Sequence, residues 1–383
     1  MKRNHLLLLT ILLLQIVPVA SFAEVCIDGI FYELDASKKQ AEVTIDNSFV
    51  QNSSDEARKT YKGVVTIPET VSYKGVTYDV TSIGTAAFWG NDELKDVQIP
   101  NSITHIGDNA FRSCPQLESI TIPKSVTNIG KAILEGCDAV SSIIVDKENK
   151  VYDSRDNCNA IIHTETNELI QGCPKTIIPN TVKRIGGYAF TGFTSLTSID
   201  IPNSVTNIGE AAFMHTGLKE VVIPNSVVYI GIWSFDNCTN LSSITLSESL
   251  TSLPLWSFSS CNLSSITIPA SVESIEDAFS ASFTPITSVY FLSTNPPIIK
   301  DNMGLDSNTT IHVPVGYKDV YENNDLWKNF TIIDDVAIQT TGIATLTTSN
   351  VQHPSPIFDI SGKLLSAPRK GINIIDGKKV NIK

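Results

Sequence analysis

The sequence lacks the short motifs that mark most catalytic and metal-binding sites. It contains no G-x-S-x-G, no G-x-G-x-x-G, no phosphate-binding loop, and no pair of Cys or His residues at the close spacing that zinc requires. Its six histidines are scattered, and its Asp and Glu residues are spread along the chain. These absences predict no catalytic residue, no cofactor and no metal, and they argue against an enzyme.

Positive charge and long apolar runs are also scarce. The formal net charge is −12, which disfavours nucleic acid and anionic membranes as partners, because both select basic surfaces. The apolar run Leu6–Val19 is too short to span a bilayer comfortably. With Lys2 and Arg3 before it and Ser21-Phe22-Ala23 after it, this run predicts a signal peptide over residues 1–23 and no transmembrane span after cleavage. An uncleaved anchor helix is the alternative.

What the sequence does contain is one phrase that recurs at intervals of 22 or 23 residues. It reads I-P-x-S-V-x-x-I-G-x-x-A-F and is followed by L-x-S-I-T, with clear copies beginning at Ile99, Ile122, Ile201, Ile223 and Ile268. A period this short is typical of a solenoid. One coil cannot bury its own apolar side, so we expect the coils to stack around one continuous core.

Each part of the phrase predicts a local structure. Apolar and polar residues alternate towards the end of Leu117–Pro123, which indicates a half-buried strand that the proline ends. The Ala-Phe pair that follows the Gly suits a tight helical or 3₁₀ turn. Stacked strands would form a parallel sheet with neighbours about 4.8 Å apart. Equivalent rings would then share one dry interior, namely Phe111, Phe190, Phe213 and Phe235.

This repeat resembles the BspA-like class of bacterial cell-surface leucine-rich repeats, also called leucine-rich repeat type 5. The resemblance spans nearly the whole mature chain. It implies a right-handed leucine-rich-repeat solenoid, rich in parallel β-strands, with β caps at both ends. Asp28–Leu34 and Thr77–Ile83 resemble the family's N-terminal cap, and Tyr152–Ile162 resembles the hairpin inserted between some of its repeats.

The resulting domain map has six parts. We expect a signal peptide at 1–23, an N-terminal β cap at 24–80, a repeat solenoid at 81–290 with a hairpin insertion at about 146–175, a C-terminal cap at 291–335, a Thr/Ser-rich linker at 336–352 and a small β tail at 353–383. The tail carries an Asp376-Gly377 hairpin signal. It resembles sorting or surface-retention modules of secreted Gram-negative proteins. An additional hairpin without a sorting role is the alternative.

The cysteines fall into distinct groups. Four of the seven occupy one slot in successive coils, namely Cys114, Cys137, Cys238 and Cys261. We predict buried thiols there, because side chains in a ladder run parallel and reach the disulfide torsion with difficulty. Cys158 and Cys173 would lie opposite each other across a hairpin that turns at Glu165-Thr166. A disulfide between these two is plausible in an exported protein.

The outward-facing strand residues are the predicted binding face. They form a Ser/Thr-rich stripe: Asp96, Gln98, Ser119, Thr121, Ser198, Asp200, Glu220, Ser243, Thr245, Ser265 and Thr267. The alternative is that short hydroxyl side chains simply suit an exposed parallel sheet. Aromatic anchors, which are common in interfaces, are sparse on this face.

The resemblance implies an exported or cell-surface protein that adheres to extracellular proteins or cell surfaces through a multivalent repeat surface. Weak contacts that repeat along a rigid array add up, which suits adhesion. The expected location is the medium or the outer surface of a Gram-negative bacterium. Two alternatives stay open: an accessory protein that binds glycans, and a structural spacer that binds nothing.

Overall fold

The structure is a computed structural model. It describes residues 23–45, 61–280, 285–300, 302–337, 357–359, 364–365, 371–375 and 378–382. Apart from Ala23, the predicted signal peptide lies outside the described residues, and so does the predicted linker beyond Ala337. All structural statements below concern the described residues.

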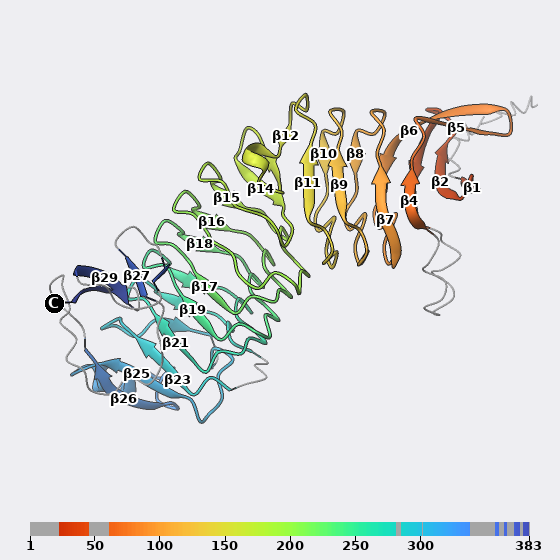
Figure 1. Cartoon of the computed structure of the whole chain (residues 1–383). Coiled ribbons are helices and arrows are strands. Elements are labelled where there is room, and N and C mark those ends of the chain that lie inside the picture. Colours follow the sequence, from red (N-terminus) through yellow and green to blue (C-terminus); the bar gives the residue numbers. More distant parts are fainter. Residues whose placement is uncertain are drawn as a thin grey trace, which may run out of the picture.

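The chain winds into a β-solenoid of about 11 turns with parallel strands and almost no helix, which confirms the predicted fold class (Figure 1). One side of the stack carries the longer strands, several of which end near the proline of the repeat, and we call it the long-strand face. Its strands are β4 (Lys62–Thr66), β7 (Glu93–Gln98), β9 (Ser119–Ile122), β11 (Ser142–Val145), β17 (Glu220–Val222), β19 (Ser243–Thr245), β21 (Ser265–Ile268), β23 (Ser288–Phe291), β25 (Thr310–Pro314) and β26 (Thr331–Val336).

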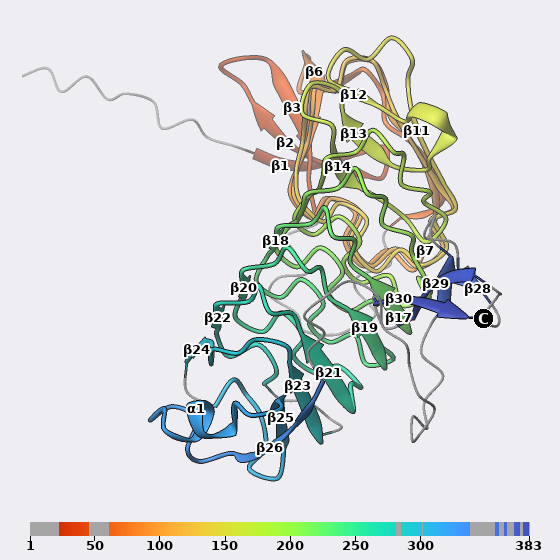
Figure 2. The same cartoon turned by 90° about the vertical axis from the view of Figure 1, so that its left-hand side faces the viewer.

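The other side carries a two-residue strand in most coils, and we call it the short-strand face. Its strands within the repeats are β8 (His105–Ile106), β10 (Asn128–Ile129), β15 (Arg184–Ile185), β16 (Asn207–Ile208), β18 (Tyr229–Ile230), β20 (Ser252–Leu253), β22 (Ser274–Ile275) and β24 (Ile298–Ile299). Figure 2 views the stack from its end and shows β18, β20, β22 and β24 on the side opposite β19, β21, β23 and β25.

The N-terminal strands continue directly into the short-strand face. They are β1 (Ala23–Ile27), β2 (Ile30–Asp35), β3 (Gln40–Val43), β5 (Thr70–Tyr73) and β6 (Val76–Ile83). The sheet runs in the order β1-β2-β3-β6-β8-β10, and β5 pairs with β6. The first pairs are antiparallel, whereas β3, β6, β8 and β10 are parallel. An antiparallel start therefore covers the first edge of the parallel stack.

The C-terminal end of the stack is closed by large aromatic side chains. Helix α1 (Lys318–Glu322) precedes β26, and the buried rings of Tyr321 and Trp327 pack against Phe291. Beyond residue 337, the structure describes the backbone of a four-stranded antiparallel sheet formed by β27 (Ile357–Asp359), β28 (Leu364–Leu365), β29 (Gly371–Ile375) and β30 (Lys378–Ile382).

An insertion enlarges the stack on one face only. On the short-strand face it adds β12 (Tyr152–Asp153), the 3₁₀ turn η3 (Arg155–Asn157), β13 (Ile161–His163) and β14 (Glu168–Gln171), and β14 pairs in parallel with β15. On the long-strand side, Asp138 reaches straight across to the next coil, where Ser195 N and Ser195 Oγ donate to its carboxylate at 2.9 and 2.8 Å. The added strands lengthen the stack on the short-strand side only. The row of coils accordingly changes direction near β12 and β14 (Figure 1).

The core consists of equivalent side chains stacked from coil to coil. Phe190, Phe213, Phe235, Phe258 and Phe279 form an unbroken ladder with ring centroids 5.2 to 6.0 Å apart and interplanar angles of 7° to 19°. All five rings are fully buried. The predicted shared interior is therefore present, and it explains why each coil needs its neighbours.

The Ala-Phe segments differ from the prediction in one local detail. They form turns and no helix, because the residue two positions before the Phe takes a left-handed φ, as Asn109 does at 57°. The Phe111 N–H also donates to Ile133 O of the next coil at 3.0 Å. Backbone groups that a helical turn would have satisfied internally thus bond between coils instead.

The repeated Gly after the short strand has a spacing role. A Cβ added at Gly107 would lie 2.5 Å from Thr85 N, and one at Gly209 would lie 2.5 Å from Gly187 N. Both contacts are with the backbone of the preceding coil, which cannot easily move. Glycine at this slot therefore lets consecutive coils approach closely.

Candidate functional site

The long-strand face aligns side chains from successive coils in rows. Ser119 pairs with Ser142, and Thr121 with Ile144, while in a later pair of coils Glu220 lies beside Ser243. Of the residues predicted to form the binding face, seven are exposed: Gln98, Thr121, Ser198, Asp200, Glu220, Ser265 and Thr267. Asp96, Ser119, Ser243 and Thr245 are half-buried. Ser198 and Asp200 lie in an extended segment that forms no strand.

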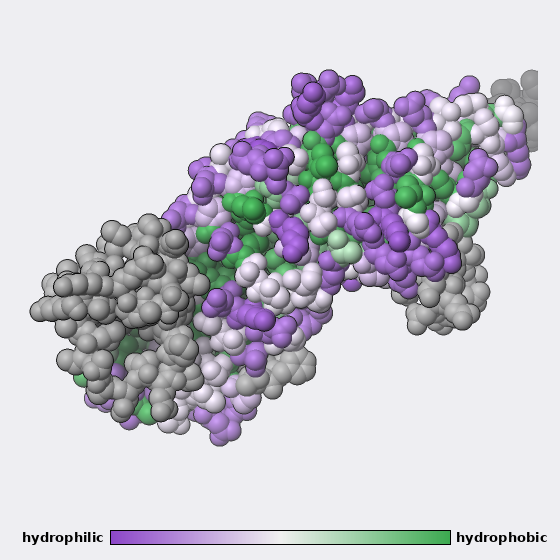
Figure 3. All heavy atoms as spheres, in the orientation of Figure 1, coloured by the Kyte–Doolittle hydropathy of each residue, from purple (hydrophilic) through white to green (hydrophobic). Residues whose placement is uncertain are grey.

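This face also carries apolar side chains that the sequence-based stripe does not include. Val64, Ile144, Val222 and Ile333 expose between 37% and 57% of their surface. Figure 3 shows hydrophobic side chains at several separate places among polar ones on the visible side of the stack. The face is therefore a mixture of hydroxyl, acidic and apolar groups.

An aromatic pair extends the rows towards the C-terminal end. Tyr290 pairs with Thr267 on one side and with His312 on the other, and the Tyr290 and His312 rings stack with centroids 4.3 Å apart. The Nδ1 atom of His312 lies 2.9 Å from a carboxylate oxygen of Asp335. Sequence reasoning missed this pair because the repeat phrase fades after Ile268, and only the strand register reveals it.

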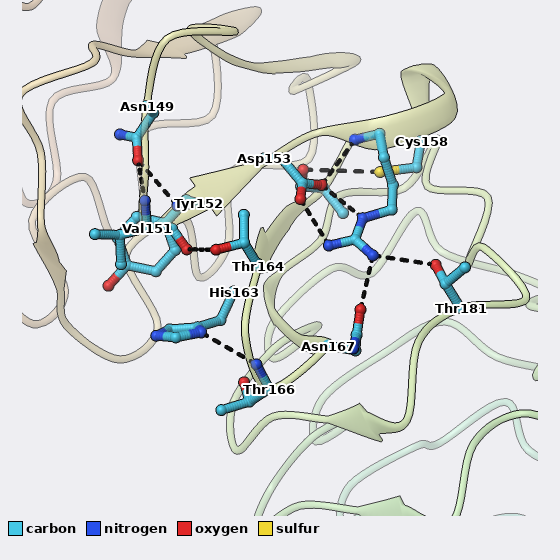
Figure 4. A network of polar contacts seen from close by, with 12 residues as sticks. Asn149, Val151, Tyr152, Asp153, Cys158, His163, Thr164, Thr166, Asn167 and Thr181 are labelled. Carbon is cyan, nitrogen blue, oxygen red and sulfur yellow. Dashed lines mark hydrogen bonds and ion pairs between the residues drawn. The ribbon is translucent and has the colours of Figure 1, made fainter.

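The insertion holds a network of polar contacts near the middle of the stack (Figure 4). The Arg155 guanidinium donates to both carboxylate oxygens of Asp153, at 2.8 and 2.6 Å, and to Asn167 Oδ1 at 2.7 Å. It also reaches Thr181 Oγ1 at 3.4 Å, just beyond the insertion. The network fixes the hairpin to the stack, and the Arg155 charge is neutralised by Asp153 within the insertion.

The four slot cysteines are buried free thiols, as the spacing predicts. Each donates to the carbonyl oxygen of a Phe in the preceding coil at 3.0 to 3.2 Å, namely Phe88, Phe111, Phe213 and Phe235. Burial raises the pKa of Cys238 to about 11 and also raises the pKa of Cys137 and Cys261. A neutral, inaccessible thiol is a poor nucleophile, so this ladder is structural.

The predicted partners Cys158 and Cys173 are also buried free thiols in the structure. The hairpin has the expected pairing of His163 with Glu168, but a β-bulge beyond Ile162 shifts the register by one residue. The Cys173 Sγ consequently points to Asn159 O, at 3.6 Å. Their disulfide stays a prediction. Titration of free thiols in the unfolded exported protein tests it. All seven cysteines should react if the disulfide is absent, and two fewer should react if it is present.

A third side of the stack is formed by the Ala-Phe turns, and we call it the turn edge. It is defined by the left-handed residues two positions before each Phe-equivalent: Ala86, Asn109, Ala132, Tyr188, Ala211, Trp233 and Trp256. Trp233 and Trp256 come from adjacent coils, and their rings stack with centroids 5.9 Å apart. Trp256 is 38% exposed, and Trp233 is half-buried.

The described residues were also compared with the needs of a metal site, a cavity and a membrane span. Within the described residues, no group of three or more His, Cys, Asp and Glu side chains is arranged to hold a metal ion. A cavity of about 460 Å³ near the C-terminal end is lined by Asn302, Asp306, Asp325, Phe330 and their neighbours, without a cysteine or histidine. None of the described helices has the length and apolarity needed to cross a membrane.

Comparison with known proteins identifies the repeat. The family model for the BspA type leucine rich repeat region matches six copies, at residues 69–171 and 168–287. These residues make up more than half of the chain. No curated protein matches the sequence.

Several solved structures are similar to this chain. They include a leucine rich cell surface protein from Faecalibacterium prausnitzii A2-165 at 20% identity, with 82% of this chain and 95% of that chain covered and a TM-score of 0.36. The pneumococcal vaccine antigen PcpA is 17% identical, with 82% and 99% covered and a TM-score of 0.45. A leucine-rich repeat protein from Eubacterium ventriosum ATCC 27560 is 20% identical, with 81% and 93% covered and a TM-score of 0.45.

Proposed function

Because the chain belongs to the family of BspA-type leucine-rich repeat proteins, we propose that it is an exported surface protein that binds extracellular protein ligands along its long-strand face. Repeats of this family and fold generally serve in binding and not in catalysis. The proposal extends the family assignment in two ways, by naming the face that binds and the class of ligand.

One observation carries the choice of face. Successive coils present side chains in register, so that Ser265, Ser288 and Thr310 form one outward row and Thr267, Tyr290 and His312 form the next. Neighbouring members of a row are separated by one strand spacing, about 4.8 Å. A ligand that makes one weak contact can therefore make the same contact again along the array, which raises its overall affinity without any single strong site.

The composition of this face favours a protein ligand. Hydroxyl and carboxylate groups offer hydrogen bonds, and the exposed Ile144 and Val222 add apolar area between them. Protein interfaces combine the same kinds of group, with apolar positions surrounded by polar ones. The stacked Tyr290 ring supplies an aromatic side chain of the kind that anchors interfaces.

Export and surface retention complete the proposal. The predicted signal peptide would direct the chain out of the cytoplasm, and the tail beyond residue 352 would retain it at the surface of a Gram-negative cell. Truncating the chain after Asp335 tests the second step. We expect the truncated protein in the culture medium and not in the cell-surface fraction, and normal surface display would disprove retention by the tail.

The binding test compares two faces of the same coils. The purified protein is incubated with an array of extracellular matrix proteins and soluble glycans. We expect Thr121→Lys with Thr245→Lys to remove protein binding, because both side chains project from the long-strand face. Asn128→Lys with Ser252→Lys adds the same charge to the short-strand face of the same two coils and should leave binding intact.

Other outcomes have defined meanings. Binding of glycans alone would make the protein a glycan-binding accessory protein. Equal loss of binding in both variant pairs would show that added charge, and not the long-strand face, causes the effect. Absence of any ligand on the array, together with intact surface display of both variants, would leave the spacer role.

A further inference from the structure

Aromatic side chains on the turn edge, or directly beside it as Trp89 is after Phe88, occur in two different situations. Trp89 in the early coils has the Arg112 guanidinium 5.9 Å from its ring centroid. Tyr188 has the Lys131 ammonium 5.4 Å from its ring centroid. In both cases the cation comes from a neighbouring coil of the same chain. The protein thus repeatedly places a positive charge over an aromatic ring on this edge.

The Trp233–Trp256 pair is different. The two rings stack on each other, and among the described residues neither has a Lys or Arg side chain placed over it. Sequence explains the difference, because residues 184–299 contain only two basic residues, Arg184 and Lys219, against eight acidic ones. This part of the chain therefore carries two tryptophan rings that could bind a cation, but very few basic side chains that could fill that role.

Acidic groups lie close to the pair. The Glu276 carboxylate accepts a hydrogen bond from Leu255 N, directly before Trp256, at 3.1 Å. The backbone N–H of Trp256 donates to the backbone oxygen of Asp277 at 2.9 Å, so the two backbones are adjacent. On the Trp233 side, the Asp236 N–H donates to Trp233 O at 3.0 Å. Acidic residues are therefore hydrogen-bonded, through the Glu276 side chain or through the backbone, to the segments that carry the two rings, and the ring faces are themselves electronegative.

The two tryptophans are not needed to build the coils. Their backbones have φ values of 57° and 54°, and a bulky residue in this conformation is unusual. Ala86, Ala132 and Ala211 occupy the same slot in other coils with the same left-handed conformation. Neither tryptophan belongs to the hydrophobic core cluster, which Phe235 and Phe258 fill in these two coils.

From these observations we propose that the Trp233–Trp256 pair, with Asp236, Glu276 and Asp277, forms a site for an arginine or lysine side chain of a basic polypeptide. The partner supplies the cation that this part of the chain lacks. Electrostatic attraction brings the basic segment to the acidic surface, and the indole rings then hold the cationic group. The site lies on the turn edge and not on the long-strand face, so its failure would leave the proposed function standing.

The test uses the full chain and a fluorescently labelled peptide of alternating arginine and serine, followed by fluorescence anisotropy at physiological ionic strength. A matched peptide carries neutral citrulline in place of each arginine. We expect binding of the arginine peptide and no binding of the citrulline peptide. Trp233→Ala with Trp256→Ala should weaken arginine-peptide binding about tenfold, as expected for the loss of a partly desolvated cation–π contact.

Three further variants separate the site from general acidity and from misfolding. Trp89→Ala truncates an exposed tryptophan of the early coils and should leave peptide binding unchanged. Trp233→Tyr with Trp256→Tyr keeps two aromatic faces and should retain most of the binding. Glu276→Gln keeps an acceptor for Leu255 N and removes one charge, so we expect a loss of only about two- to threefold. Circular dichroism confirms that each variant is folded.

Several results would overturn the proposal. One is arginine-peptide binding that is unaffected by the double alanine variant, which would assign the attraction to net charge alone. Equal binding of the two peptides, or binding of neither, would also contradict it. Binding of a soluble oligosaccharide that depends on both tryptophans would reassign the pair to stacking against sugar rings.

Discussion

The two runs of coils on either side of the insertion share a core but differ in surface charge. The first run, residues 61–145, has six Lys and Arg residues against nine Asp and Glu. The second run, residues 184–299, has two against eight. Both runs place their phenylalanines and cysteines in the same buried slots. The core positions are therefore constrained by stacking, whereas the surface positions are free to differ, and ligand specificity should follow the surface.

The runs also differ in how neighbouring coils are joined at the surface. In the first run, Lys62 lies 3.0 Å from Glu93 and Arg112 lies 3.0 Å from Glu135, so ion pairs connect consecutive coils. Within the described part of the second run, no ion pair of this kind joins one coil to the next. Exposed ion pairs contribute little to stability. The second run can therefore be as stable as the first without such ion pairs, provided that its core packs at least as well.

The core of the second run is the more regular of the two, and this difference predicts the largest mutational effect. Phe213 stacks on Phe190 and on Phe235, each at 5.2 Å, whereas Phe111 stacks only on Phe88, at 5.3 Å. We expect Phe213→Ala to lower the free energy of unfolding by about 4–5 kcal/mol and Phe111→Ala by about 3 kcal/mol, because the first leaves a cavity between two rings. Guanidinium denaturation followed by circular dichroism measures both, and equal losses would show that ring stacking adds nothing to burial.

A smaller effect should appear where the two runs meet. The buried Gln171 side chain accepts from Leu134 N at 3.4 Å and donates to Ala189 O at 3.0 Å, so it connects the last coil of the first run to the opening coil of the second. Gln171→Ala would leave the Leu134 N–H without a partner and should cost about 1–3 kcal/mol. The exposed Gln116 supplies the control, since Gln116→Ala should be neutral.

The same variant should also separate the unfolding of the two runs. The stability of a solenoid depends on the interfaces between neighbouring coils, so weakening one interface lowers cooperativity there. In a Trp89→Phe background, the remaining tryptophans Trp233, Trp256 and Trp327 all lie on the C-terminal side of the insertion and report on that side by fluorescence, whereas circular dichroism reports on the whole stack. We expect coincident transitions in the wild type and separate ones in Gln171→Ala. Coincident transitions in the variant would mean that the long-strand side alone couples the runs.

The next prediction concerns the long-strand side of the junction between the two runs. The Asp138 carboxylate accepts from Ser195 N and Ser195 Oγ across the insertion, and these groups are exposed. Asp138→Ala should therefore cost only about 1 kcal/mol, less than Gln171→Ala, because water can replace the lost hydrogen bonds. Thermal unfolding of the two single variants and the double variant measures the coupling between the faces. A cost for Asp138→Ala larger than that for Gln171→Ala would reverse the ranking of the two sides.

Periodicity in the sequence was enough to predict the slots of the core but not the contacts between unlike elements. Phe213 and Cys238 follow from the 22- or 23-residue phrase, because each copy places them at the same offset. Gln171 does not, since its role depends on where the insertion returns to the stack. The left-handed turn residues were hidden because Asn, Ala, Tyr and Trp share that slot without a common glycine signal. Tyr290 and His312 lie beyond the last clear repeat, where only strand register relates them.

The smallest predicted effect concerns a feature in which the two runs are alike. Each run buries two slot thiols, and burial raises the pKa of Cys238 to about 11, above the ordinary value near 9. In native protein at pH 8, a thiol reagent should therefore label the exposed Cys26 and leave Cys114, Cys137, Cys238 and Cys261 unreacted. Because the unfolded chain releases the Cys238 proton at lower pH than the folded chain, stability should fall as the pH rises from about 9 to about 11. Faster labelling of the first pair than of the second would show that the ion-paired run opens more readily than the run with the continuous ring ladder.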